Sequence, residues 1–428
     1  MKKTQIFTLF SEKIQSQNNQ KIITSILENN IEGFLEPYQD WQNLLLNKKY
    51  IKINKEPSLT VAIILKNEER CVERCLTSLV SIQEIDEIVL VDTGSTDNTI
   101  DIINDFASPK IKLYTTQWNN DFSEARNFAI DKVQSDWVLF LDADEWLESI
   151  QIKPLLNLLS EFDIQKQVTL CPKIIDANDN YYQNIPRLFC VCDQIRYYGC
   201  IHEEPVAKDS EKLMDISIST KINHDGYEPS IIEKKNKQKR NISLIKKMMQ
   251  TDKSTKWVYY YIRDGLNFVD DHELVSIIKK NVLIDESKGF SENNLMITDY
   301  TYALLSFLCE ILSRINPIQI SSVTKLMTKL IPHSSNAFYY DTIQKIQKLK
   351  GEFKILLDET ISYRNNHTSI EPEMIHTEFY HIDFLLSMLL FETGKFDLAY
   401  DYIDFLKEKY PMPEIYTYYL SAKSIKLE

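Results

Sequence analysis

Strand-like and helix-like segments alternate four times between residues 58 and 145, and this alternation constrains the fold more than any other feature of the sequence. Four apolar runs rich in branched or aromatic residues are separated by segments with apolar residues at helical spacing. The runs are LTVAIIL, EIVLV, KIKLY and DWVLFL. Alternating strands and helices with short connections are typical of a parallel, doubly wound sheet with right-handed crossovers. The sequence therefore predicts an α/β fold.

Helical segments are predicted on both sides of this sheet domain. Residues 1–56 form a polar N-terminal helical extension, and residues 57–230 form the sheet domain, with QVTLCPKII and SISTKINHDGY as a mixed extension of the sheet. Residues 231–428 are predicted to form an all-α domain. The stretch FLLSMLLFETGKFDLAYDYIDFLKEKYP follows the glycine, aromatic, alanine and proline pattern of a tetratricopeptide helix pair. Repeats of that kind present a concave surface to a partner.

Composition excludes several classes of function. The 428 residues carry a formal net charge of −13, whereas a nucleic-acid-binding protein needs a basic face. No apolar run approaches the roughly 18–20 residues of a membrane span. The N-terminus also lacks the apolar core of a signal peptide, so a cytoplasmic location is expected. The seven cysteines are expected to be reduced and structural, although Cys190, Cys192 and Cys200 lie close enough in sequence to consider a thiolate metal site.

Polar motifs follow the second and fourth strands, where doubly wound sheets bind ligands. Asp142 and Asp144 end the fourth strand, and carboxylates in this position suit Mg²⁺ or Mn²⁺ bridging to a diphosphate. Asp92 ends the second strand before a Gly-Ser-Thr-Asp turn, whose backbone and hydroxyl donors could bind an anion near a helix N-terminus. For each motif, a capped turn with a purely structural role is the alternative. The second motif is not a P-loop, because no Gly-Lys-Ser/Thr follows it.

A third cluster lies after Gly199, where His202, Glu203 and Glu204 are consecutive, and a second histidine, His224, occurs in the stretch NHDGY. Either histidine alone is more often structural than functional. Together with the acids they provide candidates for proton transfer and for metal binding.

These motifs in this order resemble the family 2 glycosyltransferases of the GT-A fold, a Rossmann-like doubly wound sheet. The resemblance covers roughly residues 58–228 and is carried by VAIILKNEER, VDTGSTD, FSEARNFA and DAD. It implies a nucleotide-sugar site that comprises Lys66, Asn67, Glu68, Asp92, Gly94, Ser95, Arg126, Asp142 and Ala143. It also implies a site for Mg²⁺ or Mn²⁺ at Asp144 and Asp142, with His224 or His202 available to complete it. The QxxRW signature of processive synthases is absent, so a polymerase is not expected.

A narrower similarity points to the acceptor. WNNDFSEARN, RLF, HEEP, HDGY, KRN and the tetratricopeptide-like tail are similar to the peptide S-glycosyltransferases that modify bacteriocins of the sublancin type. The similarity implies inverting transfer of a hexose from a UDP-sugar, with UDP-glucose expected, to a cysteine-containing peptide, with serine as the alternative acceptor. Glu203 is the favoured base, with His202 and Glu204 as rivals. Arg187 and Arg196 are predicted either to hold the diphosphate or to form ion pairs, and a homodimer is among the expected assemblies.

Two other functions fit the same sequence. A sugar transferase for cell-envelope material, such as a lipopolysaccharide core, would share every donor-side residue. A non-catalytic scaffold would retain the fold but bind no nucleotide sugar.

Overall fold

The computed structural model describes residues 55–161, 164–192, 194–208, 213–225, 237–366, 378–407 and 409. The chain forms two compact units, the first ending at Lys253 and the second beginning at Ser254. Almost all of the predicted N-terminal helical extension, residues 1–56, lies outside the described residues. In the described parts of the chain, no helix is long and apolar enough to cross a membrane.

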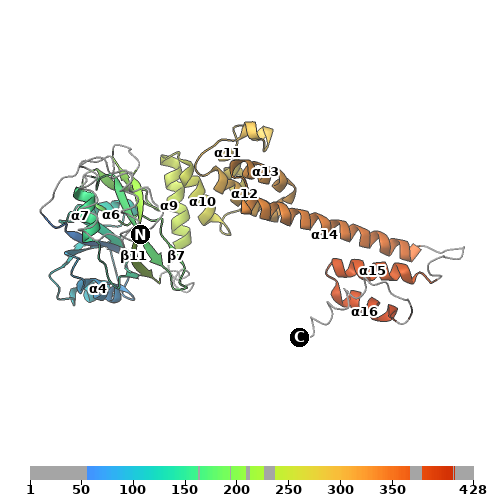
Figure 1. Cartoon of the computed structure of the whole chain (residues 1–428), viewed down its shortest axis with the longest axis horizontal. Coiled ribbons are helices and arrows are strands. Elements are labelled where there is room, and N and C mark those ends of the chain that lie inside the picture. The colour runs from blue at the N-terminus through green and yellow to red at the C-terminus, as the bar shows by residue number, and fades with distance from the viewer. Residues whose placement is uncertain are drawn as a thin grey trace, which may run out of the picture. The chain divides into compact units, whose positions relative to one another are not determined.

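The first unit is built on the predicted parallel sheet, visible in blue and green in Figure 1. Its first four strands lie in the order β3-β2-β1-β4 and are all parallel. They are β1 (Leu59–Leu65), β2 (Glu87–Asp92), β3 (Ile111–Thr115) and β4 (Trp137–Leu141). The connecting helices are α4 (Val72–Val80), α5 (Thr99–Asn104) and α6 (Phe122–Ile130). The doubly wound half of the sheet is therefore confirmed.

Beyond β4 the same sheet continues with mixed strand directions, as predicted. The order continues β8-β6-β11-β5, with β8 antiparallel to both β4 and β6, and β11 parallel to β6. The strands are β5 (Glu145–Trp146), β6 (Val168–Ile175), β8 (Leu188–Cys190) and β11 (Met214–His224), with the short β7 (Tyr181–Tyr182) beside β6. One further helix, α7 (Lys153–Glu161), follows β5.

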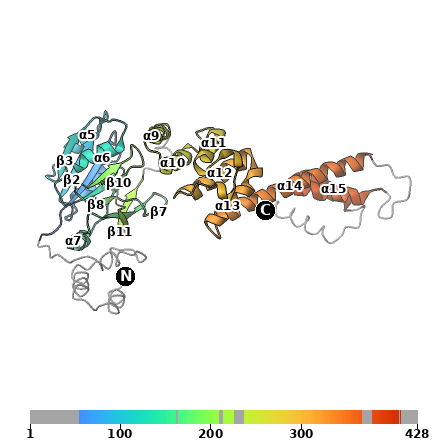
Figure 2. The same cartoon turned by 90° about the horizontal axis from the view of Figure 1, so that it is seen from above.

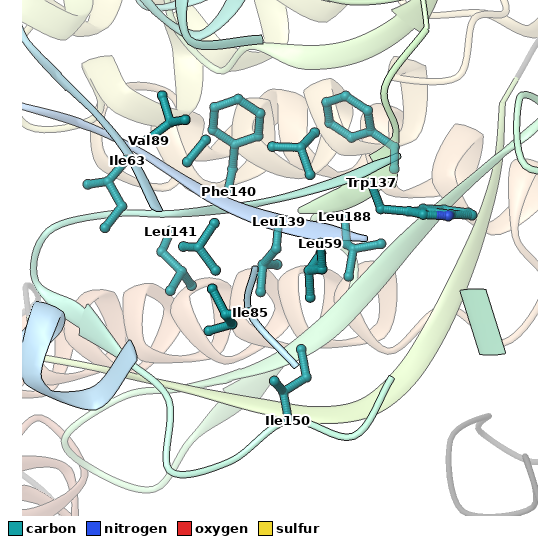
Figure 3. Close-up of a cluster of buried hydrophobic side chains, with 14 of the residues drawn as sticks. Leu59, Ile63, Ile85, Val89, Trp137, Leu139, Phe140, Leu141, Ile150 and Leu188 are labelled. Atoms are coloured by element: carbon teal, nitrogen blue, oxygen red, sulfur yellow. The ribbon is translucent and has the colours of Figure 1, made fainter. Parts of the chain in front are cut away.

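Strand β4 is buried on both faces, which explains why its sequence is a continuous apolar run rather than an alternating one. In Figure 3, Phe140 points to one side of the strand and Leu139 and Leu141 point to the other. Residues two apart in a strand share a face. Asp142, which directly follows the strand, therefore continues the face of Phe140 and comes close to the helix packed there.

A two-stranded ribbon and one more helix complete the first unit. The ribbon comprises β9 (Ile195–Tyr198) and β10 (Glu204–Ala207), which pair antiparallel. Helix α9 (Lys237–Thr251) packs against the loop between them, because Cys200 bonds through its N–H to the sulfur of Met248 and through its thiol to the carbonyl of Leu244. The first unit therefore ends after α9, whereas the sequence placed the boundary at residue 230.

The second unit is mainly helical in its described residues, with one isolated antiparallel bridge between Leu283 and Leu295 (Figures 1 and 2). Its α-helices are α10 (Thr255–Gly265), α11 (Asp271–Val282), α12 (Thr301–Ile315), α13 (Ile320–Leu330), α14 (Ser335–Asn366), α15 (Tyr380–Glu392) and α16 (Phe396–Leu406). The predicted tetratricopeptide-like stretch forms the pair α15–α16. Gly394 lies in their turn at a φ of 80°, in the left-handed region that favours glycine. The 32 residues of α14 form one uninterrupted helix, which departs from a helix–turn–helix repeat.

All seven cysteines are free, and six of them are buried. Cys192 is half-buried, and its sulfur lies 3.7 Å from that of Cys190. No group of three or more potential metal ligands occurs in the part of the chain that the structure describes, so the alternative of a thiolate site gains no support.

Candidate functional site

Two loops at the carboxyl ends of β1 and β2 interlock to form one side of the candidate site. The carboxylate of Asp92 accepts hydrogen bonds from the N–H groups of Gly94 (2.9 Å) and Ser95 (3.1 Å). Asn67 donates its N–H to the hydroxyl of Ser95 (2.9 Å) and accepts from the N–H of Thr96 (2.8 Å). Asn67 has a φ of 57°, which is uncommon outside glycine and tolerated best by asparagine and aspartate. The two loops therefore hold each other in a fixed shape.

These contacts divide the predicted donor-site residues into two roles. Asp92 is buried and fully used in shaping its own turn. Glu68 anchors the first loop, since its N–H donates to the hydroxyl of Thr99 (2.8 Å). Lys66, Asn67 and Gly94 are exposed and remain able to meet a ligand.

Five charged side chains form a continuous chain of alternating sign beside these loops, which we call the charged chain. Arg126 donates to Glu203 (2.6 Å) and to Asp142 (3.0 Å). Arg187 donates to the other oxygen of Asp142 (3.0 Å) and to Glu145 (3.0 Å). The side chain of Asp142 is 38% exposed, whereas those of the other four are at most 11% exposed. Asp142 is therefore the member through which the charged chain meets solvent or a ligand.

The charged chain sets the ionisation of its acids. Desolvation opposes ionisation of Asp142, but Arg187 and Arg126 outweigh it and hold the pKa of Asp142 well below the ordinary value. Burial raises the pKa of Glu145 to about 8, with Arg187 opposing the shift and the charge of Asp142 adding to it. Asp142 therefore stays ionised near neutral pH, while burial makes ionisation of Glu145 less favourable.

The guanidinium of Arg126 contacts two aromatic rings as well as two acids. Its guanidinium carbon lies 5.2 Å from the ring centre of Phe140 and 5.3 Å from that of Tyr197, at cation–π distance. Its helix, α6, begins with Asp121 as the N-cap, which accepts the N–H of Glu124. The Nη1 atom of Arg126 is buried and has no hydrogen-bond partner among the described residues. A buried donor of this kind is costly unless a ligand oxygen or water meets it.

Asp144 and His224 face each other next to the charged chain. Nε2 of His224 lies 3.6 Å from an oxygen of Asp144, because the end of β11 pairs with β5 and places residue 224 opposite residue 145. Arg74 binds the carbonyl of Asp144 (3.3 Å) and pairs with Asp225 (2.6 Å). These contacts hold the backbone segments that carry the side chains of Asp144 and His224.

Asp144 and His224 fit one divalent cation better than Asp144 and Asp142 do. Adjacent ligands of a six-coordinate ion of this size lie about 3 Å apart, close to the observed 3.6 Å. Both oxygens of Asp142 already accept guanidinium hydrogen bonds. Two protein ligands are enough where substrate phosphates and water complete the sphere, and an imidazole suits Mn²⁺ better than Mg²⁺.

The loop of the β9–β10 ribbon carries the predicted base. Its backbone is anchored on α6, since the N–H of Phe122 donates to the carbonyl of Cys200 (3.1 Å). His202 has a φ of 48°, a strained conformation that is concentrated at functional sites. Of the three candidates, the structure joins Glu203 to the charged chain, while Glu204 is already the first residue of β10.

Comparison with known proteins finds the same family that the sequence motifs resemble. Residues 60–222 match the model of glycosyl transferase family 2. We call this matched segment the family 2 domain. Similar proteins include the SPbeta prophage-derived glycosyltransferase SunS of Bacillus subtilis (strain 168), 29% identical over 290 residues, which are 66% of this chain and 66% of SunS. The chain thus spans just under two thirds of that relative's length.

Two further similarities concern parts of the chain. A TPR repeat-containing protein of Synechococcus elongatus is 33% identical over 147 residues, 34% of each chain. Residues 1–349 of TarS from S. aureus, crystallised in complex with UDP-GlcNAc, superpose with a TM-score of 0.33 at 15% identity, covering 68% of this chain and 92% of that chain.

Just beyond the family 2 domain, the sequence left one charged residue without a role. Arg240 of α9 lies over the ring of Phe122 at 5.1 Å, and its positive charge acts on Glu203. It lies beyond the matched residues 60–222. The motif KRN was noted in the sequence, but only the contact between α9 and the ribbon loop shows that Arg240 borders the site.

The two arginines with open predictions are now placed. Arg187 is buried inside the charged chain rather than on the surface. Arg196 donates to the carbonyl of Cys192 (2.7 Å) and lies 3.4 Å from Asp131. Ala143 is buried between the two aspartates of the DAD motif and exposes almost nothing.

Proposed function

We propose that the family 2 domain transfers a hexose, with inversion, from UDP-glucose to the thiol of a cysteine in a bacteriocin precursor peptide. The observation that carries the proposal is the bridge made by Arg126. One guanidinium binds both Glu203, the predicted base, and Asp142, the first acid of the donor motif. The family match supports the reaction class, and the resemblance to sublancin-type enzymes supports the acceptor.

The donor would bind across the interlocked loops and the charged chain. Lys66, Asn67 and Gly94 are exposed at the loops and face the position of a nucleotide at the carboxyl ends of β1 and β2. The Nη1 of Arg126, which has no partner in the part of the chain that the structure describes, supplies a donor for an oxygen of the diphosphate or sugar. Asp144 and His224 would hold a divalent cation, which when bound neutralises negative charge on the departing UDP.

The chemical step is a single displacement. The bond between the anomeric carbon and the diphosphate oxygen breaks, and a bond from the same carbon to the acceptor sulfur forms on the opposite face. The thiol proton passes to Glu203, and UDP leaves. A thiol with an ordinary pKa of about 8.5 is already a few per cent thiolate at neutral pH, so a cysteine acceptor demands less of the base than serine does.

The test is intact-mass spectrometry of a helical peptide that contains one exposed cysteine and one serine. The peptide is incubated with the full chain, UDP-glucose and Mn²⁺ or Mg²⁺, with EDTA as a control. A hexose-sized gain that maps to cysteine and disappears with EDTA supports every part of the proposal. UDP release without peptide modification would keep the transferase and reject this acceptor, as would a gain on lipid or glycan material.

Two variants test the assigned roles in the same assay. Glu203→Gln is expected to lose transfer while retaining UDP-glucose binding, and Asp144→Ala is expected to lose transfer together with the effect of metal. Glu204→Gln is the matched control, since Glu204 lies one residue along the same loop and begins β10. If Glu204→Gln lost transfer and Glu203→Gln did not, Glu204 would be the base.

A further inference from the structure

Two cysteines, Cys190 and Cys192, lie at the far end of β8 from the charged chain. Arg187, which precedes this strand, belongs to the charged chain, whereas Cys190 ends the strand opposite Trp137, the first residue of β4. The proposed donor site lies at the carboxyl ends of the parallel strands. The two thiols are therefore at the opposite edge of the sheet, and the transfer reaction does not use them.

The sulfurs of these two cysteines are close enough to react with each other. The thiol of Cys190 donates a hydrogen bond to the sulfur of Cys192 across 3.7 Å. A disulfide has an S–S bond of about 2.05 Å. Because the two side chains already meet through their sulfur atoms, a movement of less than about 2 Å between these atoms separates the dithiol from a disulfide.

The surroundings of the two thiols give them different reactivities. Cys192 is half-buried, whereas Cys190 is buried. The hydrogen bond from Cys190, opposed by partial burial and assisted by the N–H groups of Gln194 and Ile195 and by the charge of Lys166, lowers the pKa of Cys192 to about 6. The same hydrogen bond, together with burial, raises the pKa of Cys190. Cys192 is therefore the more accessible thiolate, and Cys190 is the protonated thiol beside it.

A thiolate in contact with a second thiol is the arrangement that disulfide exchange requires. The thiolate attacks a disulfide to form a mixed disulfide, and the second thiol resolves it. The donors around Cys192 stabilise the reduced pair, and a disulfide whose reduced form is stabilised is easily reduced again. Cys71 and Cys75, four residues apart at the start of α4, offer a contrast, since both are buried and burial raises the pKa of each.

We propose that Cys190 and Cys192 form a reversible disulfide-exchange site for a low-molecular-weight disulfide. The Cys192 thiolate attacks one sulfur of the small disulfide, which forms a mixed disulfide and releases one small thiolate. The sulfur of Cys190 then attacks that of Cys192, and the second small thiol leaves with the proton of Cys190. The pair is oxidised, and the small disulfide is reduced to two thiols. The proposal does not depend on the reaction catalysed by the family 2 domain.

Thiol counting on the full chain tests the site with glutathione disulfide as the probe. The reduced protein is incubated with the probe, quenched with acid, denatured, alkylated with N-ethylmaleimide and analysed by mass spectrometry. Two thiols fewer are expected to be alkylated, the peptide that contains residues 190 and 192 should carry a disulfide, and dithiothreitol should restore both thiols. A chain that keeps all seven cysteines alkylatable overturns the proposal. A stable glutathione adduct without a disulfide, or a disulfide between other cysteines, also overturns it.

Serine variants assign the two roles. Cys190→Ser is expected to stop at the glutathione adduct of Cys192, whereas Cys192→Ser is expected to keep all its remaining thiols alkylatable. Cys171→Ser is the matched control, because Cys171 is a buried thiol of the neighbouring strand β6, and this variant should oxidise as the unaltered chain does. A glutathione adduct on Cys190 in the Cys192→Ser variant would overturn the assignment of Cys192 as the attacking thiol.

Discussion

The guanidinium of Arg126 donates to Glu203 and Asp142 and rests on two aromatic rings, while its buried Nη1 has no hydrogen-bond partner among the described residues. This geometry requires the planar fork of arginine, since the ammonium of lysine is a compact point charge that cannot span both acids. The side chain therefore determines where the proposed base and the proposed donor site lie relative to each other.

Arg126→Lys is expected to reduce kcat for sugar transfer by about 100-fold or more, the cost of losing a positioned donor at a reacting centre. Retaining the positive charge limits the destabilisation that an unpaired buried acid would otherwise cause. Steady-state kinetics and thermal unfolding separate the two effects. Arg196→Lys is the control, since Arg196 pairs with a largely exposed acid, Asp131. Equal losses in both variants would contradict the assigned role.

Cys192 is expected to be the reactive thiol of the chain. A hydrogen bond from the Cys190 thiol, opposed by partial burial and assisted by two backbone N–H groups, lowers the pKa of Cys192 to about 6. Burial raises the pKa of Cys71, Cys171 and Cys309 to about 12. Alkylation of Cys192 should therefore rise to its plateau through about pH 6, while the buried thiols stay unmodified. Peptide mapping after timed iodoacetamide treatment measures this, and Cys190→Ser should move the midpoint to higher pH.

At the level of single elements, β4 connects the core to the site through its alternating side chains. Leu139 and Phe140 point to opposite sides of the strand (Figure 3). The ring of Phe140 contacts the guanidinium of Arg126 at 5.2 Å. The two residues are neighbours in sequence and both are fully buried, so they form a matched pair for separating stability from function.

Leu139→Ala is expected to lower the free energy of unfolding by about 2–5 kcal/mol through the cavity it leaves, with the Michaelis constant for the donor unchanged. Phe140→Leu should cost less stability but reduce transfer, because Arg126 loses the ring on which it rests. Denaturant unfolding and initial-rate kinetics on both variants check this. If Leu139→Ala reduced transfer more than Phe140→Leu does, the side of β4 on which a residue lies would not determine its effect on transfer.

The elements of the sheet were predictable from sequence because each strand is an apolar run of the right length between helical segments. The DAD, VDTGSTD and HEE motifs were found in the same way, because each follows a strand end. The charged chain was not predictable, since Arg187 and Asp142 are 45 residues apart and meet only through the antiparallel pairing of β8 with β4. Arg240 was missed for the same reason, because its role depends on α9 packing against the ribbon loop.

At the scale of the whole molecule, two compact units with separate cores follow each other along the chain. The proposed donor site lies entirely within the first unit, since every residue that forms it precedes Lys253. The second unit contributes no residue to that site. Ligand binding should therefore stabilise the first unit and leave the second unchanged.

Differential scanning calorimetry is expected to show two unfolding transitions, as is usual where units carry their own cores. UDP-glucose with Mn²⁺ should raise the unfolding temperature of the first unit only. The added free energy of unfolding is about 2.7 kcal/mol at a donor concentration 100 times its Kd. A single transition would show that the units unfold as one.

The charged chain also bears on how this sequence can change over generations. Three acids share two guanidinium groups. Losing one arginine therefore leaves a buried acid without its partner, which is destabilising. Losing an arginine together with its acid avoids that destabilisation. Residues 187 and 145 should therefore covary among related sequences. Natural relatives that lack the arginine should also lack the acid. In random libraries selected for activity, the double change should be enriched over its frequency before selection more strongly than either single change.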